Sequence, residues 1–311
     1  MGHMSADAEE WWALEQEDPL IASIVIPEYV RQYKPTGKQL TTTTKSGHHV
    51  RFIYSNVEFT RFEQEHINAF KVYAIKKLEG PQLETEEAIE SFKKRFGNTA
   101  FGEDGYLLRC LIGNSYKYPL CFDDMKENLI WRKNTLPIRR SEIETALARG
   151  IIYVHGRDRC MRPVIILQLS NAAKCPHELI LRCVFFTLEV VIHKLMIPGR
   201  IEQWRVIVDL NGTNLLALQV TLIKQIAHAL TVNYRGRLSQ MFIINAPYII
   251  SGLWSLVKTV LPEVTQEKIH ISSGKNSKKL LDTIEVSQLE MKFGGGAQNV
   301  TVYDIPVMPE M

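Results

Sequence analysis

The segment MFIINAPYIISGLWSLVKTVLP, residues 241–262, is mostly apolar, whereas the rest of the chain has the composition of a water-soluble protein. A membrane-spanning helix needs roughly twenty consecutive apolar residues. Pro247 and Pro262 bound the second half of the segment and leave 14 residues between them. We therefore predict no membrane span, but a short strand from residue 241 followed by a helix over residues 248–261.

The predicted helix has two faces when its residues are projected at about 100° per residue. Ser251, Ser255, Lys258 and Thr259 lie on one side, and Trp254 lies at the boundary. One interpretation is a surface helix that covers a sheet. The other is a movable lid over an apolar cavity, with the Trp254 ring at a membrane interface. Periodicity does not decide between them. The opposite side is apolar and consists of Leu253, Leu256, Val257, Val260 and Leu261.

Strand-like runs alternate with helical runs on both sides of this segment, from Gly150 onward. Helical patterns cover residues 177–197 and 214–231. Strands interleaved with helices predict an α/β layer with a largely parallel sheet. The strand-like runs are IIYVHG (151–156), RPVIILQL (162–169), QWRVIVDL (203–210) and KIHIS (268–272).

The N-terminal part has a different pattern. Residues 59–145 show helical periodicity and predict a small helical bundle. Before it, EEWWALEQ predicts a short helix with Trp11 and Trp12 as packing anchors. Residues 39–55 predict a β-hairpin around Ser46-Gly47.

Composition restricts the function classes. Apolar residues make up 45% and charged residues 23% of 311 residues, as in folded globular proteins, and a net charge of +3 does not indicate nucleic acid binding. Five cysteines without a C-x-x-C pair argue against disulfides and zinc and favour a reducing compartment. The pair His48-His49 has no third ligand nearby, so we predict no metal. No signal segment follows residues 1–3, and we expect a cytoplasmic protein.

Six short motifs follow one another in order between residues 103 and 295. Together they resemble the CRAL-TRIO family of lipid-binding and lipid-transfer proteins, which includes phosphatidylinositol-transfer proteins and tocopherol and retinaldehyde carriers. Residues 4–55 match nothing in that family. The motifs are EDGYLLRCL (103–111), WR (131–132), MRPV (161–164), DLNG (209–212), YRGR with INAP (234–237, 244–247) and LEMKFGG (289–295).

The resemblance implies a helical region followed by a sheet-floored pocket that the 248–261 helix closes as a gate. It divides the chain into a cloning remnant (1–3), an N-terminal extension of unknown role (4–58), a helical region (59–145), a lipid-binding domain (146–300) and a tail (301–311). Gly294 and Gly295 would form a hinge or a plain turn. Expected pocket residues are Trp204, Val206, Val208, Leu230, Tyr234 and Ile244, and expected gate residues are Ile250, Leu253, Trp254, Leu256, Val257, Val260 and Leu261.

Alignment through residues 245–247 places Lys268 at the family position that contacts an inositol phosphate or a membrane phosphoinositide. A solvated lysine at a strand end is the alternative. Thr265 matches a nearby threonine, whereas Gly236 replaces a partner acid. His270 lies on the same side of the strand as Lys268, where a hydrogen-bonding or core role is favoured over a pH switch. Lys117 lies close to Asn114 and Ser115, which replace two basic residues. Trp204, Val206 and Leu230 replace the small hydroxyl residues of a choline site.

The resulting hypothesis is a cytosolic, peripherally membrane-associated carrier that binds one phospholipid, phosphatidylinositol among the candidates, and transfers or presents it between membranes. No cofactor is expected beyond the lipid. The alternative is a lipid sensor or a protein-interaction scaffold, with residues 4–58 as the contact surface. No nucleophile–base pair or metal set supports an enzyme, and SSGKNSKK (272–279) lacks the spacing of a phosphate-binding loop.

Overall fold

The computed structural model describes residues 6–44, 46–47, 49–97, 99–214, 220–275, 278–304 and 306–309, so His48 lies outside the described residues. The chain divides into two compact units. The helical unit contains the residues up to Glu17 together with Ile53–Pro137. The sheet unit contains Asp18–Phe52 and the residues from Ile138 onward. Residues 18–52 of the expected N-terminal extension thus belong to the sheet unit.

The helical unit confirms the predicted bundle. Its core contains the fully buried Phe70 and Phe92. In α1 (Ala6–Glu17), Trp11 is buried but Trp12 is 56% exposed, so Trp11 alone of the pair is a packing anchor. The elements are α1 (Ala6–Glu17), α5 (Arg61–Glu79), α6 (Thr85–Phe96), a 3₁₀ turn (Ala100–Gly102), α7 (Asp104–Gly113) and α8 (Tyr118–Thr135).

The longest helix of this unit, α5, begins with a capping box. The Thr60 hydroxyl accepts a hydrogen bond from the Glu63 amide at 3.2 Å, and the Glu63 carboxylate accepts one from the Thr60 amide at 2.8 Å. This reciprocal pair satisfies two amides that have no partner within the helix. The local sequence therefore determines where α5 starts.

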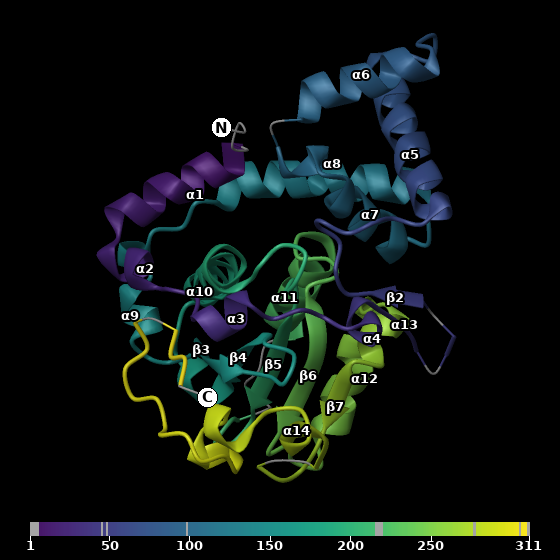
Figure 1. Ribbon diagram of the computed structural model, residues 1–311. Coiled ribbons are helices and arrows are strands. Elements are labelled where there is room, and N and C mark those ends of the chain that lie inside the picture. The colour runs from purple at the N-terminus through teal and green to yellow at the C-terminus, as the bar shows by residue number, and fades with distance from the viewer. Residues whose placement is uncertain are drawn as a thin grey trace. The chain divides into compact units, whose positions relative to one another are not determined.

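The sheet unit has a five-stranded sheet within the described residues, in the order β3-β4-β5-β6-β7 (Figure 1). β3 pairs with β4 antiparallel, and the other neighbours are parallel. The predicted α/β class is confirmed. The strands are β3 (Ile152–Arg157), β4 (Pro163–Gln168), β5 (Trp204–Asp209), β6 (Leu238–Ile244) and β7 (Ile269–Ile271).

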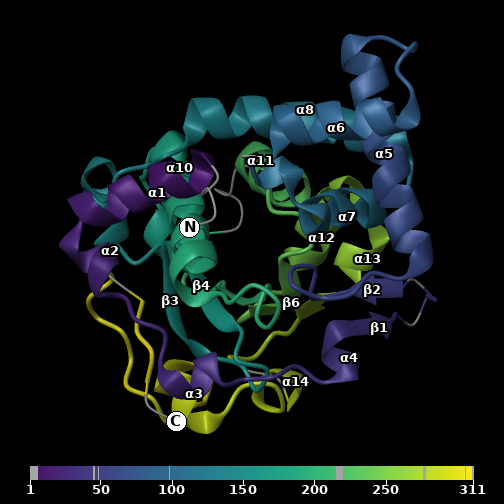
Figure 2. The same cartoon turned by 45° about the horizontal axis from the view of Figure 1, so that its top comes forward.

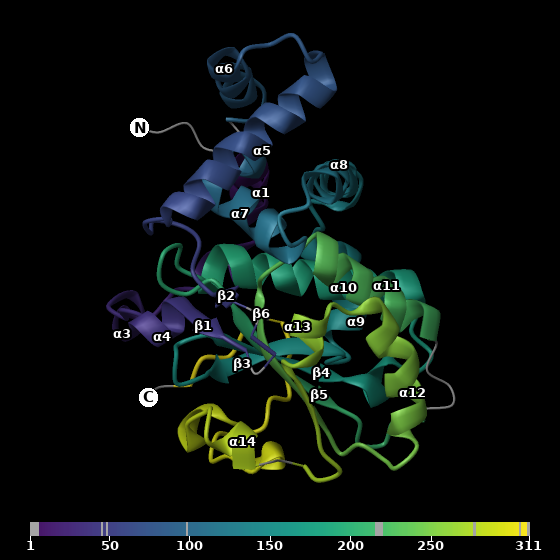
Figure 3. The same cartoon turned by 90° about the vertical axis from the view of Figure 1, so that its right-hand side faces the viewer.

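The two faces of this sheet have different covers (Figure 3). We call the side under α10 (His177–Val190), α11 (Val220–Val232) and α12 (Ile250–Val257) the helix face. The closed face lies under α14 (Lys278–Leu281) and the chain that follows it, where a core forms around Phe242, Leu280 and Phe293. Shorter elements are α9 (Glu144–Leu147), α13 (Glu263–Gln266), a π-helical turn (Val191–Leu195) and 3₁₀ turns at Arg140–Glu142, Leu169–Ala172, Lys258–Val260, Val286–Gln288 and Met291–Phe293.

Residues 18–52 form an arm that runs along the sheet unit (Figure 2). Asp18 pairs with Arg140 at 2.8 Å, and the Gln39 amide donates to the Cys160 sulfur at 3.2 Å. The predicted hairpin is confirmed, because Thr41 pairs with Arg51 in antiparallel register. The arm contains α2 (Pro19–Ser23), α3 (Glu28–Arg31), α4 (Gly37–Leu40), β1 (Thr41–Thr43) and β2 (His49–Arg51).

The predicted strand and helix of the opening segment become β6 and α12, and a 3₁₀ turn, Lys258–Val260, completes the helix. Throughout the described part of the chain, no helix combines the length and the apolar character needed to cross a bilayer.

Candidate functional site

Strand β6 shows where the sheet is incompletely covered. Phe242 and Ile244 point to the closed face and are 1% and 0% exposed. Met241 and Ile243 alternate with them, point to the helix face and are only half-buried. β6 lies between β5 and β7, so these apolar side chains keep access to solvent in the interior of a sheet. The helix layer does not fill the space above them, because a filled layer would exclude water.

The neighbouring strand extends this surface. Ile269 pairs in register with Met241, and Ile271 pairs with Ile243. Ile269 is half-buried and Ile271 is 37% exposed. We call Met241, Ile243, Ile269 and Ile271 the apolar strip. It is a continuous hydrocarbon surface on the helix face near the β7 edge.

The β5 side of the same face is filled. Trp204, Val206 and Val208, which were expected to line a pocket, point to the helix face, but all three are buried. The Trp204 ring lies 6.0 Å from that of Tyr234, which stacks on Phe185 of α10 at 6.3 Å. These expected pocket residues therefore form a packed wall beside the apolar strip.

Tyr234 is held in this wall by a buried hydrogen bond. Its hydroxyl donates to Oε1 of Glu189 at 2.9 Å, and Oε2 of Glu189 lies 3.3 Å from Nε2 of His193. The bond links the turn after α11 to α10. Leu230 lies half-buried on α11.

Ile244 does not belong to this set, because it is packed into the core of the closed face. Sequence reasoning selected it and missed Met241, Ile243 and Ile269. Consecutive side chains of a strand point to opposite faces, so Ile243 and Ile244 cannot both face the helices. This alternation was the signal in the sequence that separates the residues of the apolar strip from those of the closed face.

Helix α12 is an incompletely buried amphipathic helix that packs against α11. Val257 is buried, whereas Leu256 is 51% exposed and Val260 is 39% exposed. Nε2 of Gln266 donates to the carbonyls of Lys258 and Leu261 at 3.1 and 2.9 Å, which closes the end of the helical segment. The remaining expected gate residues, Ile250, Leu253, Trp254 and Leu261, are half-buried.

Lys268 lies one residue before β7, half-buried, with Nζ donating to the Leu238 carbonyl at 3.0 Å. Burial, and secondly the positive charge of Arg162, lower the pKa of Lys268 to about 8. The shift means that the protein only partly compensates the positive charge of this lysine. An anionic group placed here would supply the missing compensation.

The charge near Lys268 is mostly positive. Arg205 donates from Nε and Nη2 to Oδ2 of Asp158 at 2.9 and 2.8 Å, and both side chains are buried. Nη1 of Arg162 lies 3.6 Å from the same carboxylate oxygen. The buried carboxylate of Asp158 therefore interacts with two guanidinium groups. The hydrogen-bond partner of Lys268 is a neutral carbonyl.

The other expected head-group residues do not gather around Lys268. His270 lies on the closed face, where its ring centroid is 5.2 Å from that of Phe242 and its Nδ1 is 3.4 Å from Nζ of Lys279. Burial first, then Lys279 and Arg205, lower the pKa of His270. Thr265 lies half-buried in α13. Lys117 is exposed at the start of α8 in the helical unit, and its role stays a prediction.

Gly294 and Gly295 form a tight turn. Gly294 has φ +89°, in the left-handed region, and a Cβ on Gly295 would lie 1.8 Å from the Leu289 carbonyl oxygen. The Gly295 amide also donates to the Glu290 carbonyl at 3.1 Å. Glycine is therefore required here by conformation and by close approach. These contacts favour the turn over the hinge.

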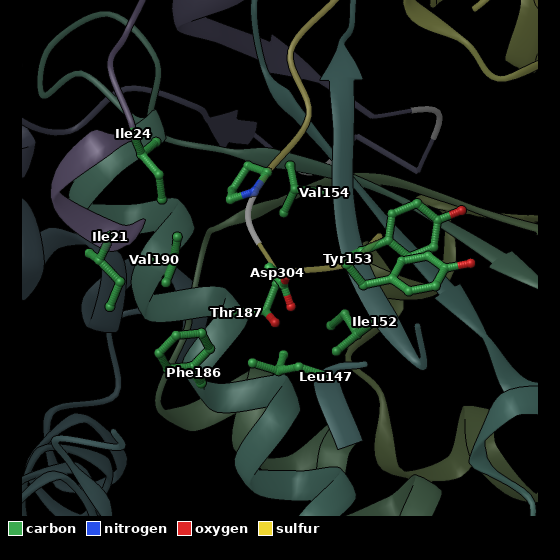
Figure 4. Close-up of a pocket in the computed structure, with 12 residues that line it drawn as sticks. Ile21, Ile24, Leu147, Ile152, Tyr153, Val154, Phe186, Thr187, Val190 and Asp304 are labelled. Carbon is green, nitrogen blue, oxygen red and sulfur yellow. The ribbon is translucent and has the colours of Figure 1, made fainter. Parts of the chain in front are cut away.

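A small cavity lies at the opposite edge of the sheet, beside β3 (Figure 4). Ile21 of α2, Phe186 of α10 and Ile152 of β3 line it. Its volume of about 30 Å³ holds no more than two or three water-sized molecules. It is therefore too small for an acyl chain, and the apolar strip is the better candidate.

Known proteins resemble this chain over a region that includes the five-stranded sheet. Residues 147–295 match the family model of the CRAL/TRIO domain. The Sec14 cytosolic factor of Schizosaccharomyces pombe is 24% identical over 241 aligned positions, and the match covers 71% of this chain and 84% of that protein. The SEC14 cytosolic factor of Yarrowia lipolytica is 31% identical over 217 residues, covering 62% of this chain and 43% of the relative.

A plant relative matches a shorter stretch. The phosphatidylinositol/phosphatidylcholine transfer protein SFH4 of Arabidopsis thaliana is 39% identical over 98 residues, covering 30% of this chain and 16% of the relative. The chain thus spans less than half the length of two of these three relatives.

The crystal structure of Sfh5 has the same fold, with a TM-score of 0.57 at 12% identity, and the match covers 81% of this chain and 93% of that one. The mostly parallel sheet, the order of the motifs and the matched domain all agree. Residues 147–295 therefore form a CRAL/TRIO domain, and the chain is similar to the Sec14 proteins that share it.

Proposed function

We propose that the protein binds a single lipid against the apolar strip and transfers or presents it between membranes. The observation that carries this proposal is the half-buried state of Met241 and Ile243 within the sheet. Helix α12, which packs on α11 and keeps apolar side chains exposed, would be the gate. The names of the Sec14 and SFH relatives support the same function.

The energetics favour exchange at a membrane surface. A two-chain lipid holds about thirty methylenes, and at about 0.8 kcal/mol each their exposure to water costs about 20 kcal/mol. Movement from a bilayer to an apolar pocket exchanges one hydrocarbon environment for another and avoids that cost. The protein therefore docks, opens α12, exchanges its lipid and closes. No covalent chemistry is required.

The lipid that this site fits best is a phospholipid with an anionic head group, and phosphatidylinositol is one such lipid. Trp204 and Val206 fill the region where the family has small hydroxyl residues for choline. Lys268 is retained and directly precedes Ile269, the first residue of β7 and a member of the apolar strip. The alternation of the strand directs its side chain to the side of His270 and Arg162, so a head group would reach it around the start of β7. Thr265 lies three residues before Lys268, and its backbone carbonyl accepts a hydrogen bond from the Lys268 amide at 3.1 Å.

Native mass spectrometry of the purified protein tests lipid binding directly, and we expect one phospholipid per chain. Transfer of labelled phosphatidylinositol between vesicles tests the activity. Lys268→Ala should reduce transfer of phosphatidylinositol more than that of phosphatidylcholine, and Trp254→Asp should reduce both. A protein that is free of lipid and fails to extract labelled lipid contradicts the proposal.

A scaffold is the second candidate, because the wall around Trp204 is packed and the arm of residues 18–52 lies outside the matched domain. In that case neither Lys268→Ala nor Trp254→Asp would alter vesicle binding or lipid transfer. We propose a cytoplasmic, peripherally membrane-associated protein in either case.

A further inference from the structure

Two segments that are distant in sequence meet at the end of the sheet where β6 and β7 finish (Figure 3). The Asn245 amide donates to the Gly274 carbonyl at 2.9 Å, and the Ala246 amide donates to the Ser272 carbonyl at 3.0 Å. These bonds hold the turn before α12 against the loop after β7. The two segments therefore form one continuous surface.

The turn before α12 exposes large apolar side chains. Tyr248 is 98% exposed, Ile249 is 57% exposed, and Pro247 before them is exposed as well. We call these three residues the wedge. Single exposed apolar residues are common on soluble proteins, but adjacent ones at a loop tip indicate an interaction site. Tyrosine in particular has an apolar ring with a polar end, which suits the boundary between lipid and water.

The loop after β7 adds positive charge beside the wedge. Lys275 and Lys278 are exposed, and within the described residues neither forms an ion pair. Lys279 is also exposed, with its Nζ 3.4 Å from Nδ1 of His270. The exposed acid nearest in sequence is Asp282, whose amide donates to the Lys278 carbonyl at 2.8 Å. The surface therefore has an apolar tip and a net positive rim.

We propose that the wedge and the lysines at 275, 278 and 279 form a docking surface for an anionic lipid bilayer. Tyr248 and Ile249 enter the interface, and the ammonium groups contact anionic head groups. Ile250, the first residue of α12, follows the wedge directly. Docking therefore brings the start of the gate helix to the membrane. The inference specifies where the proposed lipid carrier docks and which bilayers it selects, and it rests on that function only for the role of α12.

The test is co-sedimentation with phosphatidylcholine vesicles that contain or lack phosphatidylserine. A basic residue near an anionic surface contributes about 1 kcal/mol, which is about a fivefold change in affinity. We expect Lys275→Gln with Lys278→Gln to weaken binding to phosphatidylserine vesicles about 25-fold and to leave the weak binding to pure phosphatidylcholine unchanged. Lys38→Gln with Lys174→Gln removes the same charge from two other exposed positions and should have a much smaller effect.

The wedge needs a separate variant, Tyr248→Ser with Ile249→Ser, which should weaken binding to both kinds of vesicle. The exposure of both side chains means that the fold should persist, and the thermal unfolding midpoint checks this. The proposal is overturned if both lysine double variants lose the same affinity for phosphatidylserine vesicles. It is also overturned if the wedge variant binds vesicles as the wild type does. Either result would indicate that this surface binds a protein and not a bilayer. Lipid content and lipid transfer are measured in separate experiments. A carrier that docks through another surface would still contain and transfer lipid, whereas a protein that is not a carrier would do neither.

Discussion

The two faces of the sheet differ most clearly along β6. Phe242 and Ile244 are locked into the closed face, whereas Met241 and Ile243 beside them are half-buried on the helix face. The four residues are similarly apolar, so composition does not explain the difference. The difference comes from what covers each face. The segment around Leu280 and Phe293 packs tightly on the closed face, whereas α12, which packs on α11, leaves Met241 and Ile243 only half-buried on the helix face. The closed face of β6 thus contributes to the packed core, and the helix face is the one that we propose for lipid binding.

The largest expected effect comes from replacing neighbours on this strand. Phe242→Ala should lower the free energy of unfolding by about 4 kcal/mol, because it opens a cavity in a packed core. Ile243→Ala should lower it by only about 1 kcal/mol, because that side chain is half-buried. Urea denaturation followed by circular dichroism measures both. Similar costs for the two variants would show that the helix face is packed as tightly as the closed face.

The buried charges of the closed face provide the next test. Asp158→Ala should lower the free energy of unfolding by about 3 kcal/mol, because Arg205 would keep a buried charge without its carboxylate partner. Glu285→Gln removes the partner of Arg159 at an exposed pair and should cost less than about 1 kcal/mol. A small effect for Asp158→Ala would mean that the closed face is more hydrated than its packing indicates.

Lys268 gives a smaller effect that depends on pH. Its pKa falls from 10.5 in the unfolded chain to about 8 in the fold. Between these values the unfolded chain binds more protons, so stability should rise as the pH increases from about 8 to 10.5.

Partial exposure of the side chain limits this gain to about 1 kcal/mol. The Lys268→Met variant should lack it, so the comparison of the two proteins by denaturation at pH 7 and pH 10 isolates the contribution of Lys268. An anionic phospholipid bound beside Lys268 should reduce the gain, because it stabilises the charged form. A gain of the same size in wild type and variant would assign it to another group.

The smallest effect on stability is expected in α12. Leu256→Ser changes a residue that is 51% exposed and should alter the free energy of unfolding by less than about 0.5 kcal/mol. Lipid transfer should nevertheless fall, because the variant removes apolar surface from the proposed gate. Val257→Ser, at a buried position of the same helix, is the matched comparison and should destabilise the fold more. Equal destabilisation would indicate a fixed cover and not a lid.

Much of the fold could be predicted because the relevant signals are local. The alternation of strand and helix patterns after Gly150 predicted the sheet, and the Thr-rich run with Ser46-Gly47 predicted the β1–β2 hairpin. The motifs predicted the family. Trp204, Val206 and Val208 were predicted to line a pocket, whereas the structure places them in the packed wall on the helix face.

The site was predicted less completely. A register shift at Trp204 in the pairing of β5 with β6, and the packing of Tyr234 on Phe185, are not visible in a strand pattern. Lys268 was expected together with His270, yet His270 packs beside Phe242 on the closed face. Ile244 was predicted to line the pocket, but it lies on the closed face, and its neighbour Ile243 on the helix face is the same residue type, so composition does not separate the two.

The sequence by itself determined the order of helices and strands, the parallel sheet and the amphipathic character of residues 250–261, because hydrophobic period and turn residues act over a few positions. Only the tertiary structure decided which side of β6 stays open. That choice depends on segments outside β6, because Leu280 and Phe293 close one face, whereas α11 and α12 leave Met241 and Ile243 half-buried on the other. Burial is a property of what packs on a residue, and the residue's own chemistry does not specify its cover.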